Sequence, residues 1–238
     1  MTQASVSEQA YQTLRAAILR GRYAPGERLT SVRLANELNV SRTPIRAALA
    51  RLKSEGLVDS SDGHAAWIPP LTVEVVEEAY EIAEALESML VARVAAVASE
   101  EGVEQLRATV AAMERAAEDG DQAAWAEADE RFHHLIEVWA GRALAASMLE
   151  RVGTVIDRVR FLSLNLHPEG ASLSAREHRG VLEAIESRDA EAARERHAAH
   201  LRRVREENVT FLRQSFPLGS PPVAVAPIPR ATTKESTE

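Results

Sequence analysis

The 238-residue sequence contains no cysteine, which excludes disulfide bonds and thiolate metal sites. It has no apolar run near the roughly 20 residues that a membrane-spanning helix needs, and its N-terminus has no apolar signal core. Aromatic residues make up only 4% of the chain, whereas alanine, glutamate, arginine and leucine dominate it. We therefore expect a mainly α-helical, cytoplasmic protein with no membrane partner.

The charges are divided unequally along the chain, whose net charge is −8. Residues 1–70 hold 9 Lys and Arg against 6 Asp and Glu, which gives +3. The remaining residues hold 19 against 30, which gives −11. The length allows two modest domains. A mildly basic N-terminal domain on an acidic body is compatible with a DNA-binding head of modest non-specific affinity.

A helix with two different faces is predicted to begin after Ser41 and to end near Gly56. The Ser41 hydroxyl is expected to accept a hydrogen bond from a first-turn amide, and Gly56 is expected to adopt a left-handed conformation. Arg42 and Arg46 are four residues apart and project from one face. The apolar positions of the other face are Ile45, Leu49 and Leu52.

The polar face of this helix suits a DNA major groove. Arginine can make two parallel hydrogen bonds to guanine, and the hydroxyls of Ser41 and Thr43 suit phosphates. The alternative is a solvated arginine face on a small core helix. The preceding sequence favours DNA, because Leu34, Ala35 and Leu38 mark a short helix that a tight turn joins to this one. That arrangement is a helix-turn-helix.

The rest of the N-terminal domain is predicted to be one helix and one hairpin. Ser7 is expected to cap a first helix that reaches about residue 20. Residues 57–58 are predicted to begin a strand, Asp62-Gly63 to form the turn, and residues 66–68 to return as the second strand of a β-hairpin wing. His64, at the tip, could reach the adjacent minor groove or could be merely exposed.

These segments resemble the winged helix-turn-helix of the GntR family of bacterial transcription regulators. The resemblance covers about residues 10–70 and rests above all on PGERL, VSRTPIR and EGLV. It implies a homodimer that reads a palindromic operator in double-stranded DNA, with Arg42 and Arg46 on the bases. Arg33 stands where the family often has an acidic residue, and we expect it to add a phosphate contact.

The sequence from residue 71 to residue 214 predicts an all-α bundle of about six helices. Pro69-Pro70 forms a short stiff linker before it. The predicted helices span about residues 73–99, 103–118, 121–140, 144–166, 172–187 and 189–214, and Ser172 or Ser174 is expected to cap the fifth. The proline-rich segment 215–238 is predicted to be a disordered tail.

A carboxylate and three histidines in this body form a candidate metal site. Asp129 and His133 are four apart and therefore share one helix face. Together with His178 and His200 they offer a ligand set for a divalent ion such as Zn²⁺, Ni²⁺ or Mn²⁺. Spacing alone leaves the alternative that these are buried, hydrogen-bonded histidines.

Residues 73–212 resemble the FCD domain, the helical ligand-binding domain of the FadR-type branch of the same family. The resemblance implies that Asp129, His133, His178 and His200 hold the metal, whereas His134 and His197 match neither signature and are expected to face solvent or a helix contact. Ala83 replaces an arginine that is expected to hold an effector carboxylate in relatives. The candidates to replace that cation are Arg158 and Arg160.

These features predict a repressor that is released when an organic acid binds at the metal-containing pocket. One alternative is a metal-responsive regulator without an organic effector, and another is a purely structural metal. A helical-bundle metalloenzyme is a rival from another class. No further carboxylate stands out as a general base and a DNA-reading domain is attached, so we do not expect an enzyme.

Overall fold

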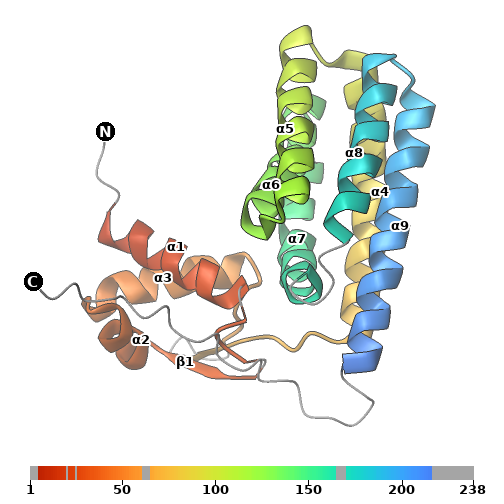
Figure 1. The fold of residues 1–238 in the computed structure, drawn as a ribbon. Helices are drawn as coiled ribbons and strands as arrows, with labels where there is room; N and C mark the ends of the chain where they lie inside the picture. Colours follow the sequence, from red (N-terminus) through yellow and green to blue (C-terminus); the bar gives the residue numbers. More distant parts are fainter. Residues whose placement is uncertain (1–4, 20, 25, 61–64, 165–169, 216–238) are drawn as a thin grey trace, which may run out of the picture. The chain divides into compact units, whose positions relative to one another are not determined.

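The computed structural model describes residues 5–19, 21–24, 26–60, 65–164 and 170–215 (Figure 1). The chain divides between Pro70 and Leu71 into two compact units. Each unit has an apolar core of its own. No helix in the described part of the chain is both long and apolar enough to cross a membrane.

The N-terminal unit contains three helices and two short strands among its described residues. They are α1 (Val6–Leu19), β1 (Arg28–Thr30), α2 (Ser31–Leu38), α3 (Arg42–Ser54) and β2 (Ala65–Trp67). Helix α1 packs against α3, and their apolar faces meet around Leu14, Ile45 and Leu52, each no more than 1% exposed. This core holds α3 with its arginine face outward.

The helix ends follow the predicted chemistry in part. The Thr30 hydroxyl accepts a hydrogen bond from the Arg33 amide at 3.3 Å and so caps α2. Gly56, after α3, has a φ of +78°, which glycine adopts without strain. Two predicted caps are wrong. Ser41 stands at the N-cap of α3 without a side-chain hydrogen bond, and Ser5 rather than Ser7 accepts the bond from a first-turn amide of α1.

The small sheet differs from the predicted hairpin. Strand β2 pairs antiparallel with β1, with Leu29 opposite Ala66. Residues 57–58 form no strand, although Asp59 makes an isolated bridge with Trp67. The reason is that the amides of Leu57 and Val58 donate to the Leu52 carbonyl oxygen, at 2.9 and 3.4 Å, after the sharp turn at Gly56. The wing tip, including His64, lies outside the described residues.

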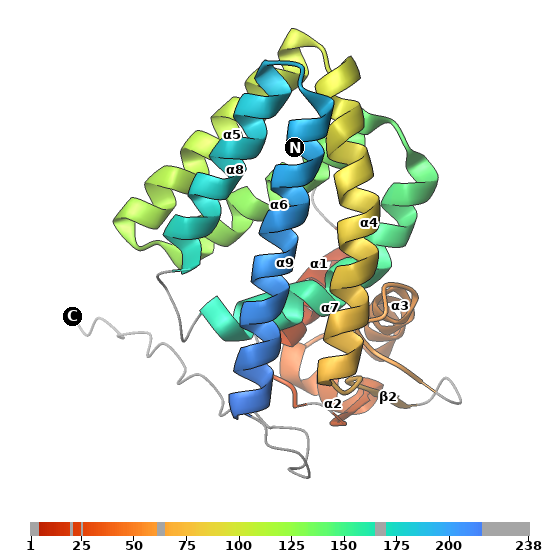
Figure 2. The same cartoon turned by 90° about the vertical axis from the view of Figure 1, so that its right-hand side faces the viewer.

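The C-terminal unit is a bundle whose six described helices confirm the predicted number. They are α4 (Val73–Val97), α5 (Glu100–Asp119), α6 (Gln122–Ala140), α7 (Ala143–Leu164), α8 (Gly170–Glu186) and α9 (Ala190–Ser215). Helices α4 and α9 lie side by side, and α8 lies next to α9 (Figure 2). Helix α6 packs against both α4 and α5. Apolar side chains from all six helices form the core of this bundle.

Side-chain caps mark the first turns of three helices of this bundle. Ser99, Asp121 and Asp189 each accept a hydrogen bond from a backbone amide at the start of α5, α6 and α9, respectively. The predicted cap of α8 is wrong, because α8 already begins at Gly170 and Ser174 is buried inside it. The predicted tail lies outside the described residues from 216 onward.

Candidate metal centre and nucleic-acid interface

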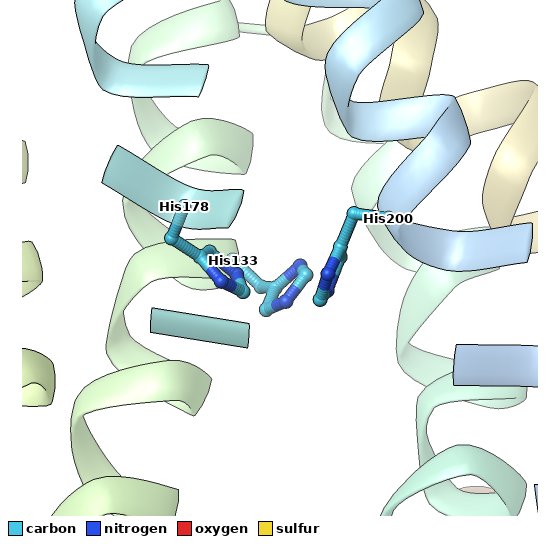
Figure 3. A group of neighbouring side chains, drawn as sticks. All are labelled: His133, His178 and His200. Atoms are coloured by element: carbon cyan, nitrogen blue, oxygen red, sulfur yellow. The ribbon is translucent and has the colours of Figure 1, made fainter. Parts of the chain in front are cut away.

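Three helices of the bundle bring the four predicted ligands together. Asp129 and His133 come from α6, His178 from α8 and His200 from α9. The three imidazole rings turn toward one shared space, with one nitrogen of each within 4.8 Å of the others (Figure 3). Asp129 Oδ1 lies 3.5 Å from His178 Nε2 and 3.9 Å from His133 Nε2. The structure thus unites residues that are up to 71 positions apart in sequence.

Each of the three histidines is held through its Nδ1 atom. His133 Nδ1 lies 2.6 Å from Glu87 Oε2, and His200 Nδ1 lies 2.6 Å from Glu177 Oε2. His178 Nδ1 lies 2.8 Å from the Ser174 carbonyl oxygen. Because carboxylates and carbonyls only accept, each Nδ1–H donates, and each Nε2 is left for the centre. This outer arrangement is typical of metal-binding histidines.

The electrostatics of the cluster favour a cation between its members. Burial lowers the pKa of His178 well below its usual value, so its Nε2 carries a lone pair that faces the Asp129 carboxylate. Burial would raise the pKa of Asp129, but Arg160 and the histidines lower it to about 2. The Nε2 atoms of His133 and His178 are buried and have no hydrogen-bonding partner among the described residues. These residues therefore fit a divalent metal ion.

Two residues that the sequence did not indicate complete the cluster, the buried His197 and the partly buried Glu87. His197 is 0% exposed, and its Nε2 lies 2.9 Å from Glu87 Oε2. The solvent-facing alternative is therefore wrong for His197, which makes a helix contact, whereas His134 is exposed. Glu87 lies on the same face of α4 as Ala83, and none of the buried residues of that helix is acidic. A carboxylate within an apolar stripe requires partners, and that signal could have identified it.

A cavity of about 580 Å³ adjoins the centre. Asp129 and His200 lie in its wall, together with Arg160, whose Nη1 is 2.6 Å from Asp129 Oδ2. Arg158 is buried and does not line this cavity, and its burial lowers its pKa to about 10. Further side chains in the wall are polar, such as Tyr80, Trp125, Ser174 and Asn208, or charged, namely Arg203, Glu206 and Glu207. Of the two predicted effector arginines, only Arg160 is placed to meet a molecule in this cavity.

The predicted DNA-reading residues share one exposed face of the N-terminal unit. Ser41, Arg42, Thr43 and Arg46 are all exposed at the start of α3. Arg42 and Arg46 border a hollow of about 360 Å³ that Thr30, Ser31 and Lys53 also line. Arg33 differs from them, because its guanidinium forms ion pairs with Glu27 and Glu37.

Comparison with known protein families matches both units. Residues 6–68 match the family described as bacterial regulatory proteins, gntR family, and residues 78–203 match the FCD domain. The chain is 31% identical to the HTH-type transcriptional regulator YdhC of Bacillus subtilis (strain 168), over 81% of this chain and 86% of that one. It is 28% identical to the HTH-type transcriptional repressor RspR of Escherichia coli (strain K12), over 88% and 91%.

Solved structures share the fold. Escherichia coli McbR/YncC superposes with a TM-score of 0.73 at 23% identity, over 90% of this chain and 100% of that one. A structure described as a metal-free FCD domain superposes with a TM-score of 0.51 at 26% identity, over 60% of this chain and 96% of that one. The two units therefore have the architecture of a helix-turn-helix domain followed by a helical FCD domain.

Proposed function

Because this chain belongs to the gntR family of bacterial regulatory proteins and carries an FCD domain, it is a DNA-binding transcriptional regulator, and we propose that it is a repressor released by an organic acid. The relatives are transcriptional regulators and not enzymes, so the metalloenzyme alternative is set aside. The proposed place of action is the cytoplasm, where bacterial DNA lies.

The convergence of one ring nitrogen from each of three histidines with the Asp129 carboxylate supports a metal at the centre. We infer that Asp129, His133, His178 and His200 hold a divalent ion, with Zn²⁺, Ni²⁺ and Mn²⁺ as the candidates for a set of imidazoles and one carboxylate. Such an ion supplies a Lewis-acid site for an oxygen of a carboxylic acid.

The adjoining cavity supports a small organic acid as effector. Its volume of about 580 Å³ lies within the range of small-molecule sites. Arg160 contributes a positive charge to the cavity wall. Burial would lower the pKa of Arg160, but Asp129 and Asp157 raise it, so the guanidinium stays charged. A bound acid can release the DNA only if it binds one conformation of the protein more tightly than the other.

The test of this function is thermal unfolding of the metal-loaded protein with small carboxylic acids and sugar acids. An acid that binds only the folded state adds about 2.7 kcal/mol of stability at a hundredfold excess over its dissociation constant, which raises the melting temperature. We expect the shift in wild type and in His134→Ala, whose side chain is exposed, but not in His178→Ala. His178→Ala protein should also lose its metal.

Two results would contradict parts of this proposal. Full metal content in His178→Ala protein would refute the ligand assignment. A strong shift on adding metal to stripped protein, with no shift for any acid, would instead favour a metal-responsive regulator or a structural metal.

The exposed face of α3 supports DNA reading by Arg42 and Arg46. We propose that they contact bases and that Ser41 and Thr43 contact phosphates of a palindromic operator. Arg33 is proposed to add a weaker phosphate contact, because Glu27 and Glu37 already balance its charge. A minor-groove contact by His64 stays a prediction.

An exposed apolar stripe on α4 supports a homodimer. Val75, Ile82 and Met89 recur every seven residues and are 39%, 38% and 40% exposed. A second copy, antiparallel about a two-fold axis at residues 85–86, would set Ile82 against Met89 and Glu78 against Arg93. Apolar side chains would then meet each other, and an acid would meet a base. We propose that this stripe is the contact between the two copies.

Placing two charges in this stripe should separate the copies. We expect Ile82→Glu/Met89→Glu protein to sediment as a monomer, because each introduced glutamate would face an introduced glutamate of the other copy, and like charges facing each other across an interface repel. Val138→Glu is the matched control, since Val138 is 53% exposed on α6, outside the stripe. A dimeric double variant would overturn the assignment of the stripe, and a monomeric wild type would overturn the dimer.

A further inference from the structure

One carboxylate oxygen joins two buried histidines at the edge of the metal centre. Glu87 Oε2 lies 2.6 Å from His133 Nδ1 and 2.9 Å from His197 Nε2. His197 is 0% exposed, and Glu87 comes from α4, which contributes none of the four proposed ligands. We propose that Glu87 and His197 are positioning residues that orient His133 and raise the metal affinity of the centre. This inference rests on the proposed metal site.

Glu87 fixes the orientation of the His133 ring. Because Glu87 accepts its Nδ1–H, the ring keeps Nε2 directed at the space shared with His178 and His200. The negative charge of Glu87 also makes the ring a stronger donor to a cation.

His197 in turn holds the Glu87 carboxylate. A buried carboxylate is costly unless several donors satisfy it. The Nε2–H of His197, on α9, provides a second hydrogen bond to the same oxygen. His197 therefore holds the Glu87 carboxylate in the position that His133 requires.

The distances favour this role over a second metal ion. Glu87, His133 and His197 could form a three-residue ligand group. However, bonds of about 2.0–2.2 Å from a metal to nitrogen and oxygen keep the ligand atoms roughly 3 Å or more apart. The observed separations of 2.6 and 2.9 Å from Glu87 Oε2 are those of hydrogen bonds.

The geometry also gives α4 a link to the centre. The proposed ligands lie on α6, α8 and α9, whereas Glu87 connects them to α4. Helix α4 is the first helix after the boundary at Pro70, so it directly follows the DNA-binding unit in sequence. The hydrogen bonds of Glu87 to His133 and His197 thereby connect the metal centre to this helix.

The experiment compares Glu87→Gln with Glu84→Gln. Glu84 lies on the same helix and also pairs with α9, through Arg202 at 2.7 Å, but touches no proposed ligand. We expect Glu87→Gln to weaken Zn²⁺ binding roughly 10- to 100-fold in a chelator competition, and Glu84→Gln to leave it unchanged. In NMR spectra of protein with ¹⁵N-labelled histidine, the ring N–H signals of His133 and His197 should shift or vanish only in Glu87→Gln.

A second pair of variants keeps the test decisive if Glu87→Gln does not fold. His197→Gln retains a donor toward Glu87 and should bind Zn²⁺ nearly as wild type does, whereas His197→Leu should bind more weakly. Equal Zn²⁺ affinity in His197→Gln and His197→Leu protein, or two Zn²⁺ ions bound per wild-type chain, would overturn the positioning role. Absence of Zn²⁺, Ni²⁺ and Mn²⁺ binding by wild type would instead refute the proposed metal site, and the N–H signals would still test the hydrogen bonds.

Discussion

Replacing Asp129 with asparagine is expected to abolish metal binding and to lower the free energy of unfolding of the metal-free protein by about 3 kcal/mol. The Asp129 carboxylate is 2% exposed and pairs with the Arg160 guanidinium, whose side chain is only 17% exposed. Removal of one partner from a buried ion pair costs roughly 3–5 kcal/mol, because the other charge is left without compensation. Asparagine preserves the volume, so no cavity contributes to the loss. Urea unfolding at pH 7 measures the difference.

The same ion pair predicts the pH dependence of that difference. The folded protein holds the pKa of Asp129 at about 2, below the value of about 3.9 expected in the unfolded chain. A lowered pKa contributes stability that is fully present above about pH 4 and is lost as the pH falls toward 2. The gap between wild type and Asp129→Asn should therefore close over this interval.

Asp157→Asn is the control for this prediction. Asp157 Oδ1 lies 3.6 Å from Arg160 Nη1, and its side chain is 27% exposed, so its loss should cost less than 1 kcal/mol, as is usual for an accessible pair. Equal losses for the two variants would show that Asp129 is not the principal partner of Arg160. An unchanged gap at pH 2.5 would contradict the lowered pKa.

The double variant Arg42→Ala/Arg46→Ala is expected to bind its operator roughly 30- to 20,000-fold more weakly. Each bidentate arginine–guanine pair contributes about 1–3 kcal/mol of discrimination, and the two side chains share one exposed face of α3. Because both are exposed, the fold should be retained. Titration of fluorescent operator DNA and of random DNA, at one fixed salt concentration, measures both affinity and preference.

Arg196→Ala is the control for the DNA-binding prediction. Arg196 is a surface arginine on α9 of the C-terminal unit, where it pairs with Glu183. Its removal changes the net charge without touching the proposed reading face, so operator affinity should be nearly unchanged. If the double variant loses affinity equally for operator and random DNA, the two arginines contact phosphates rather than bases.

Local chemistry allowed much of the architecture to be predicted from the sequence. Asp121 and Gly120 mark the boundary between α5 and α6, since one caps a helix and the other adopts a φ of +69°. The spacing of four residues placed Asp129 and His133 on one face of α6 before any packing was known. Capping, helical periodicity and turn conformation depend on atoms only a few residues apart. For this reason they can be inferred from a short stretch of chain.

Other features depended on tertiary packing. The sequence showed no reason for β2 to pair with β1 rather than with residues 57–58, because strand pairing joins distant segments. It also could not tell that Arg160 reaches the cavity and Asp129, or that Arg158, two residues earlier, does not line it.

The metal centre itself shows the same division. The sequence, together with its resemblance to a known family, was enough to propose the four ligands. Only the packing of α4 and α9 revealed that Glu87 and His197 stand behind His133. The rotation and translation of one helix against another decide which side chains meet, and these result from the whole core rather than from any single segment.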